Sequence, residues 1–389
     1  MSLPNITSQL VFLSVIFILL VIPRALQRYR IPAPLTCFVL GITTALFVAD
    51  YSNDPTLSLL AVLGISSLFL FAGLEVNIHD LKKGFWQLFG HLLIRCLILL
   101  GCVWLGVNYF GYSWQSAGLI ALAILTPSTG FILESLSSLG LDAQEKFWVT
   151  SKAIAGELLA LLLLFVILKS DSYTSLATSS AVLLAMVFGL PLLLIFLGRL
   201  VVPYAAGSEF SLLVMVGLIA AYLTKQIGVY YLVGAFLTGL AARQLREKMP
   251  SLASDQNLHA VKLFASFFIP FYFFHSGMEV PEGALQLESL WIGLTITAIV
   301  LPLRVGTITL QRVLVHRDGL KSSFYVSVAL APTLIFTLVL ARILHERYGI
   351  SDTLFGGLLL YAGLSTILPS FILSKPISLD VEQHVEQLH

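Results

Sequence analysis

Residues 153–168 read AIAGELLALLLLFVIL, a continuous apolar run that contains a single ionisable side chain, Glu157. The nearest charges along the chain are Lys152 before the run and Lys169 after it. A carboxylate at the depth of a lipid bilayer is costly unless it is neutralised or faces a water-filled cavity. Two interpretations of Glu157 follow: a protonated carboxyl that bonds to a neighbouring helix, or a carboxyl whose protonation and deprotonation are part of the function.

The composition of the whole chain indicates a membrane environment for this run. Of 389 residues, 58% are hydrophobic and 11% are charged, whereas soluble domains average about 25% charged residues. We therefore expect an integral membrane protein with the lipid bilayer as a partner. The net charge of +1 argues against nucleic acid as a partner. Cys37, Cys96 and Cys102 lie inside apolar segments, and no zinc spacing occurs, so neither disulfides nor a cofactor are expected.

The apolar segments predict an all-α polytopic membrane protein with about 13 transmembrane helices. A spanning helix needs about 20 mainly apolar residues, and the runs are continuous, which argues against a β-barrel. The expected spans lie near 7–25, 33–50, 56–75, 84–109, 114–138, 147–168, 175–201, 208–226, 229–245, 259–279, 287–312, 321–345 and 352–374.

Lysine and arginine residues are distributed unequally between the two sets of alternate loops. One set, with its helix ends, holds Arg24, Arg28, Arg30, Lys82, Lys83, Lys146, Arg199, Arg243, Arg246, Lys248, Arg312, Arg317, Lys321 and Lys375. The other set holds only Lys169, Lys225, Arg342 and Arg347. The richer side is predicted to be cytoplasmic. With an odd number of helices, the N-terminus is then outside and the C-terminus inside.

Two pairs of segments indicate an internal repeat. LFLFAGLEV (68–76) resembles YFFHSGMEV (272–280), with Gly73 and Gly277 204 residues apart (277 − 73). ALAILTPSTGF (121–131) resembles VALAPTLIF (328–336), with the prolines 205 residues apart (332 − 127). An offset of about seven helices gives the two copies opposite orientations. Inverted repeats of this kind are typical of secondary transporters.

Proline interrupts the fifth and twelfth expected spans near their middles, at Pro127 and Pro332. Proline frees backbone groups within a helix, and broken helices at matching positions of two repeats indicate a binding site at the membrane midplane. The alternative is an ordinary kink whose hydroxyls bond to their own helix. The hydroxyl residues around the two prolines are Thr126, Ser128 and Thr129, and Thr333 and Thr337.

Basic residues inside the expected spans need partners. Arg304, in the eleventh span, keeps its charge, so we expect it to bond to Glu157 directly or to the end of a broken helix. The alternative is that it extends toward the cytoplasm. We expect Lys152 to reach the cytoplasmic face. Other charged residues have less specific interpretations. His91 and Arg95 could line a cytoplasmic funnel or pair with Glu134. His275 and Glu279, near the outer end of the tenth span, are either a pH-responsive element or, as we expect, an interfacial cap.

Four motifs together resemble the monovalent cation:proton antiporter superfamily, specifically its Kef- and NapA-like branch with a sodium/hydrogen exchanger domain. FLFAGLEV (69–76), TPSTGFILESL (126–136), YYLVGAFLTGLAAR (230–243) and FFHSGMEV (273–280) are similar to family motifs of the third, fifth, ninth and tenth helices. The resemblance covers nearly the whole chain. It implies a NapA/NhaA-like fold with inverted repeats and two crossed broken helices.

The resemblance also implies a domain organisation, that of an elevator that works as a homodimer in the bacterial inner membrane. A core or transport domain slides against a dimerisation panel. The implied ranges are 1–80 and 206–283 for the panel, 81–170 and 284–376 for the core, 171–205 for a linker helix and 377–389 for a short cytoplasmic tail.

In the family, the sixth helix carries a dipeptide that ends in an essential Asp, and here that dipeptide is Gly156–Glu157. The resemblance therefore assigns Glu157 as the shared proton and cation carboxylate and Arg304 as a structural counter-charge. Oxygen ligands suit an alkali cation, and the candidate oxygens besides Glu157 are those of Ser128, Thr126 and Thr129. Lys152 and Gly156 are possible accessory residues.

The expected function is exchange of a monovalent cation, Na⁺ or K⁺, for H⁺ in the service of pH homeostasis. With one titratable carboxylate, we expect electroneutral exchange. Three other interpretations stay open: a cation channel or uniporter at the same site, an organic-anion symporter that uses Arg304, and a non-transporting membrane sensor. An enzyme is not expected, because no nucleophile–base pair or metal cluster is evident at a membrane face.

Overall fold

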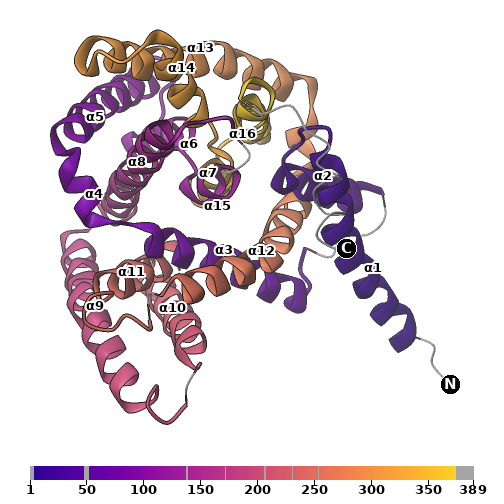
Figure 1. Ribbon diagram of the computed structural model, residues 1–389. Helices are drawn as coiled ribbons and strands as arrows, with labels where there is room; N and C mark the ends of the chain where they lie inside the picture. Colours follow the sequence, from indigo (N-terminus) through magenta and orange to yellow (C-terminus); the bar gives the residue numbers. More distant parts are fainter. Residues whose placement is uncertain are drawn as a thin grey trace, which may run out of the picture.

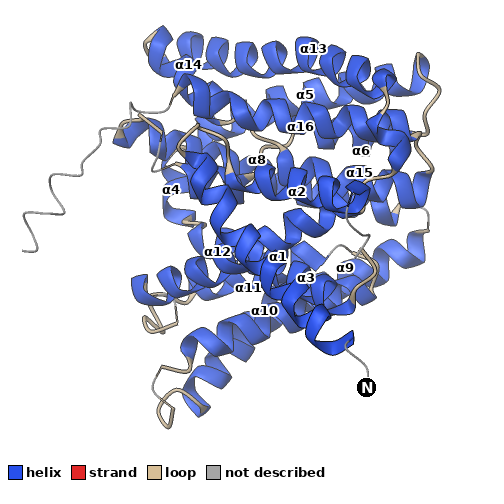
Figure 2. Ribbon diagram, turned by 90° about the vertical axis from the view of Figure 1, so that its right-hand side faces the viewer, coloured by secondary structure: helices blue, strands red, loops and turns tan. Residues whose placement is uncertain are grey.

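The computed structural model describes residues 4–47, 52–136, 139–170, 172–205, 207–229, 231–252 and 254–373, and within these ranges the chain forms helices and no β-strand (Figures 1 and 2). The predicted cytoplasmic tail lies outside them. The elements are α1 (Pro4–Gln27), α2 (Ala33–Phe47), α3 (Pro55–Glu75), α4 (Ile78–Lys83), α5 (Phe85–Asn108), α6 (Trp114–Leu125), α7 (Thr129–Ser135), α8 (Ala143–Lys169), α9 (Tyr173–Leu200), α10 (Glu209–Gln226), α11 (Tyr231–Gln244), α12 (Asp255–Met278), η1 (Glu282–Leu285), α13 (Leu287–Gln311), η2 (Arg312–His316), α14 (Leu320–Ala329), α15 (Leu334–Tyr348) and α16 (Asp352–Ile372).

Each of the thirteen predicted spans coincides with one helix or with a pair of helices. Within the described residues, nine stretches are long and apolar enough to cross a bilayer, and α14 with α15 makes a tenth that is bent by 44°. The apolar stretches Leu13–Gln27 and Ala33–Phe47 are shorter. The all-helical membrane fold is therefore confirmed, while the number of crossings and their orientation stay predictions.

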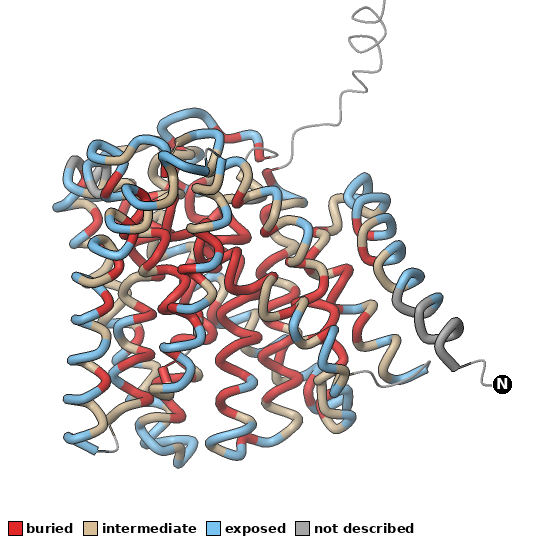
Figure 3. The backbone as a smooth tube through the Cα atoms, turned by 90° about the horizontal axis from the view of Figure 1, so that it is seen from below, coloured by how far each residue is buried: buried red, intermediate tan, exposed pale blue. Residues whose placement is uncertain are grey.

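The helices form two bundles that lie on either side of the molecule in Figure 1. The first bundle contains α1–α3 and α10–α12, with α3 and α12 as its most closely packed pair. The second contains α5–α8 and α13–α16, in which α13 packs along α16 and α15 packs against α6 and α16. Helix α9 contacts both α8 and α11. Figure 3 shows buried backbone concentrated along the inner helices and exposed residues on the outward faces.

The two repeat glycines explain the close packing of the first bundle. A Cβ on Gly73 of α3 would overlap the backbone of Phe236 in α11, and a Cβ on Gly277 of α12 would overlap the backbone of Phe38 in α2. Small residues allow helix backbones to approach each other, which is a common basis of helix association in membranes. The equivalent glycines of the two repeats therefore both allow a close approach between helix backbones.

Candidate ion-binding site

The two broken helices cross in the middle of the second bundle. Helix α6 ends at Leu125 and α7 begins at Thr129, while α14 ends at Ala329 and α15 begins at Leu334. The two breaks are joined directly, because the Ser128 amide donates to the Pro332 carbonyl at 2.8 Å. Ser128 Oγ in turn accepts the Ile335 amide at 2.9 Å, at the start of α15. The predicted helix breaks at both prolines are confirmed.

Arg304 bonds to the end of the broken α14. Its Nη2 donates to the Leu330 carbonyl and its Nη1 to the Ala331 carbonyl, both at 2.9 Å. Nη1 also donates at 2.8 Å to the hydroxyl of Tyr361 in α16. That hydroxyl donates to the Ile124 carbonyl of α6 at 2.6 Å, which links the two broken helices. Of the alternatives for Arg304, the structure has the bond to a broken-helix end.

The carbonyls at the end of α6 are also occupied. Thr337 Oγ1 donates to the Ala123 carbonyl at 2.7 Å, and Arg95 Nη2 donates to the Leu125 carbonyl at 2.5 Å. Thr333 Oγ1 lies 3.1 Å from Ser365 Oγ in α16. The hydroxyls of Thr333 and Thr337 therefore stabilise the crossing, and the backbone carbonyls freed by the break already accept hydrogen bonds.

Glu157 lies beside this crossing on α8 and is 1% exposed. Thr129, the first residue of α7, faces its carboxyl with both hydroxyl and backbone amide. Among the described residues, Glu157 Oε2 and the hydroxyls of Thr126 and Thr129 are buried without a hydrogen-bond partner. Buried polar atoms in native proteins normally have one. Thr126 and Thr129 lie at the break between α6 and α7, and Glu157 faces Thr129, so a water molecule or a hard cation at this break could be the missing partner of these oxygens.

Arg95, for which the sequence offered only a funnel-lining role or a pairing with Glu134, lies at the site. Its guanidinium comes from α5 and lies against Gly156, where an added Cβ would overlap it. It interacts electrostatically with Glu157. The side chain of Glu134, its suggested partner, lies outside the described residues. The repeat contained a signal for Arg95, because it is in the fourth expected span and Arg304 is in the eleventh, seven spans later.

The prediction that Lys152 reaches the cytoplasmic face is wrong. Lys152 is 0% exposed, and its amine donates to Gln311 Oε1 in α13 at 3.4 Å. The reason is that α14 packs against α8 and the amine meets the side chain of Gln311 before it reaches water. An accessory role of Lys152 in transport stays a prediction.

One cavity borders the crossing, and a larger one lies away from it. The smaller, of about 40 Å³, lies between α5 and α13 and is lined by His91, Arg95, Pro127, Arg304 and Gln311 among others. The larger, of about 520 Å³, lies between the two bundles. Its lining on α8 is Leu168, which at 1.5 Å per residue is roughly 16 Å along the helix from Glu157.

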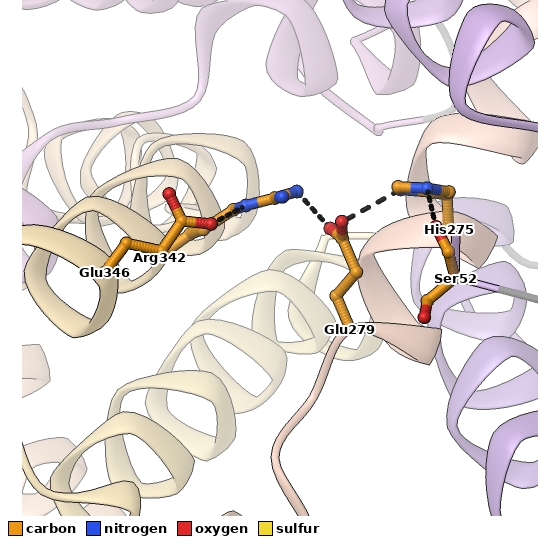
Figure 4. A network of polar contacts seen from close by, with 5 residues as sticks. All are labelled: Ser52, His275, Glu279, Arg342 and Glu346. Atoms are coloured by element: carbon orange, nitrogen blue, oxygen red, sulfur yellow. Dashed lines mark hydrogen bonds and ion pairs between the residues drawn. The ribbon is translucent and has the colours of Figure 1, made fainter. Parts of the chain in front are cut away.

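A polar network crosses the larger cavity and joins the bundles (Figure 4). Glu279, which follows α12, forms ion pairs with Arg342 of α15 and, at 3.4 Å, with His275. His275 Nε2 lies 2.9 Å from the Ser52 carbonyl, and Arg342 Nε lies 2.7 Å from Glu346. Glu279 is the C-cap residue of α12, and its side chain also ties the first bundle to the second.

The sequence of the chain matches the model of the family described as sodium/hydrogen exchanger, transmembrane, over residues 13–377. The chain belongs to the sodium/hydrogen exchanger family. The chain is 27% identical to the probable Na(+)/H(+) antiporter 3 of Methanocaldococcus jannaschii over 314 residues, which are 77% of this chain and 80% of the relative.

Two solved structures have the same fold as this chain. The sodium proton antiporter MjNhaP1 of Methanocaldococcus jannaschii at pH 8 superposes with a TM-score of 0.68 at 14% identity, covering 95% of this chain and 96% of that one. An electron-microscopy structure of the same antiporter gives 0.64 at 16% identity, with 96% and 95% covered. The chain is thus a multi-pass membrane protein of a transporter family; its placement in the Kef- and NapA-like branch stays a prediction.

Proposed function

We propose that this exchanger moves Na⁺ or K⁺ across the membrane in exchange for H⁺, with Glu157 as the carboxylate that binds either ion. The observation that carries the proposal is the set of three buried, unpartnered oxygens of Glu157, Thr126 and Thr129 beside the crossed helix breaks. Family membership and the relative's description as a probable Na(+)/H(+) antiporter support the choice of ions.

Competition for one carboxylate is sufficient to couple the two ions. When Glu157 is deprotonated, its oxygens and the two threonine hydroxyls form a hard oxygen site for an alkali cation. Protonation removes the negative charge and expels the cation. Ser128 is the weaker candidate ligand, because its hydroxyl oxygen already accepts the Ile335 amide. Arg304 holds the crossing and does not bind the cation.

Alternating access requires the site to meet each side of the membrane in turn. We assign residues 81–170 and 284–376 as the moving core, and 1–80 and 206–283 as a panel that also forms a homodimer in a cell membrane. Residues 171–205, which contain α9, connect them. The large cavity between the bundles and the small number of ties across it support this division, because sliding needs an interface that breaks easily.

The exchange is electroneutral in this proposal. The charge of the core is the same with one proton or one monovalent cation on Glu157, since Arg304 and Arg95 keep their charges. Activity in proteoliposomes should therefore not change when a membrane potential is imposed. A clear voltage dependence would contradict one-for-one exchange, and conductance far above carrier turnover would indicate a channel.

The decisive experiment is proton release from proteoliposomes on addition of Na⁺, K⁺ or Li⁺, followed with a pH-sensitive dye. Glu157→Gln keeps the size and polarity of the side chain but removes its proton exchange, so the signal should be lost. Glu157→Asp is the matched control and should retain part of it. A cation-triggered signal that persists in Glu157→Gln would overturn the proposal.

A further inference from the structure

The two repeats place an arginine at equivalent points of the crossing. Arg304 in α13 donates to carbonyls at the end of α14, the first half of the following broken span. Arg95 in α5 donates to the Leu125 carbonyl at the end of α6, again the first half of the following broken span. The negative end of a helix dipole favours a cation, so each arginine stabilises one helix end.

Each arginine also has a neighbour in the last helix of its own repeat. Tyr361, which bonds to Arg304, lies 204 residues after Glu157 (361 − 157), the same offset as between the repeat glycines. Tyr361 in α16 is therefore the repeat counterpart of Glu157 in α8. The two arginines are 209 residues apart (304 − 95), but each donates to the carbonyl two residues before the proline of the following break, Leu125 and Leu330. The counterpart of the observed pair Arg304–Tyr361 is therefore the pair Arg95–Glu157.

Gly156 leaves the space for this arrangement. A Cβ at position 156 would overlap the Arg95 guanidinium and come within 3.5 Å of Pro127 Cγ. The guanidinium thus fills the volume that a side chain at 156 would take, next to Glu157. Arg95 donates one hydrogen bond, against three for Arg304. It also lines the cavity of about 40 Å³, which has room for two or three water molecules at about 10–15 Å³ each.

We propose that Arg95 is a positioning residue that serves as the internal counter-cation of Glu157 when the carboxylate holds neither a proton nor a transported cation. An ionised carboxylate away from bulk water is otherwise left without compensation. Gly156 is also required in this proposal, because the absence of a side chain at position 156 leaves the volume that the Arg95 guanidinium occupies. This inference rests on the proposed exchange at Glu157.

The sign of the effect on transport follows from electrostatics. A fixed positive charge beside a carboxylate favours the deprotonated form and repels a bound cation. Removing that charge should let Glu157 hold its proton to higher pH, so the midpoint of the pH–activity profile should move upward by about one pH unit. At alkaline pH, where protons no longer compete, the KM for the cation should fall.

The test compares Arg95→Gln and Arg95→Lys in the same proteoliposome assay, measured as a pH profile and as KM for Na⁺ and K⁺ at alkaline pH. Arg95→Gln removes the charge but keeps an amide that can donate to Leu125, and should show both shifts. Arg95→Lys keeps the charge and should stay close to wild type in pH midpoint. Arg199→Gln, on the exposed C-terminal end of α9, is the matched control.

Gly156→Ala provides an independent route to the same state, because its methyl group should displace the guanidinium. Gly156→Ala should move the pH midpoint in the same direction as Arg95→Gln. In a chain that already carries Arg95→Ala, it should cause little further shift, because the effects of coupled positions are not additive. A merely structural role of Arg95 would lower kcat and thermal stability without moving the midpoint. Wild-type exchange with an unshifted Arg95→Gln profile would overturn this inference alone, whereas absence of cation-triggered proton release in the wild type would overturn the proposed function.

Discussion

Arg304 and Arg95 belong to matching helices of the two repeats, yet they differ in how completely they are held. Arg304 is 6% exposed and donates to two carbonyls and a tyrosine hydroxyl. Arg95 is only half-buried, borders a cavity, and donates to one carbonyl. In the last helix of its repeat, the neighbour of Arg95 is the carboxyl of Glu157, whereas the neighbour of Arg304 is the hydroxyl of Tyr361. The inverted repeat thus provides one arginine that maintains the crossing and one that is free to respond to the charge of a carboxyl.

The largest effect should come from truncating each arginine in turn. Arg304→Ala leaves two buried carbonyls without donors, at about 1–3 kcal/mol each, so we expect roughly 2–6 kcal/mol of destabilisation. Arg95→Ala exposes one carbonyl beside a wet cavity and should cost about 1–3 kcal/mol or less. Thermal unfolding in detergent, with Arg304→Lys as a control that keeps the charge, measures both. Equal losses of stability in the two alanine variants would contradict the view that Arg304 is held more completely than Arg95.

Substitutions at the counterpart residues Tyr361 and Glu157 should have different effects, the first on stability and the second on transport. Tyr361→Phe leaves the Ile124 carbonyl without its donor and one Arg304 N–H without an acceptor, which should cost about 1–3 kcal/mol while exchange continues. Glu157→Gln should abolish exchange with little change in thermal stability. Unfolding midpoints and proton-release signals of both variants check this. The symmetry would lose its functional meaning if Tyr361→Phe abolished transport as completely as Glu157→Gln.

A smaller contrast is expected between two threonines of the crossing. Thr337 donates to the Ala123 carbonyl at 2.7 Å, so Thr337→Val should lower stability by about 1 kcal/mol and leave the cation KM unchanged. The Thr129 hydroxyl has no partner among the described residues, so Thr129→Val should leave stability unchanged and raise the KM. Cation titrations of transport, with Thr129→Ser as the control that keeps the hydroxyl, decide between these roles.

Breaking an ion pair at the larger cavity should have only a small effect on stability. Arg342 is 45% exposed and Glu279 is 19% exposed, and exposed ion pairs contribute about 0.2–1 kcal/mol. Arg342→Gln should therefore lower the unfolding midpoint less than Arg304→Ala or Tyr361→Phe, and the loss should shrink at high salt. A loss as large as that of Arg304→Ala would show that the tie between the bundles, and not the crossing, dominates the stability of the core.

Much of the architecture was predictable because it depends on local pattern. Apolar runs of spanning length located the helices, Pro127 and Pro332 marked both breaks, and the glycine motifs revealed the repeat. The partners of long side chains were not predictable in this way. Lys152 was expected at the membrane face because its position along α8 allows that reach, but it is covered by helices that are distant in sequence.

The sequence by itself determined an all-helical membrane protein with two interrupted spans and one carboxyl at mid-depth, because hydropathy and proline act within a single helix. Only the tertiary structure decided which groups meet that carboxyl. It placed Arg304 on the end of α14, Ser128 on the start of α15, and Arg95 over Gly156. These contacts depend on the angle and depth at which separate helices cross, a property of several segments together that no single run of residues contains.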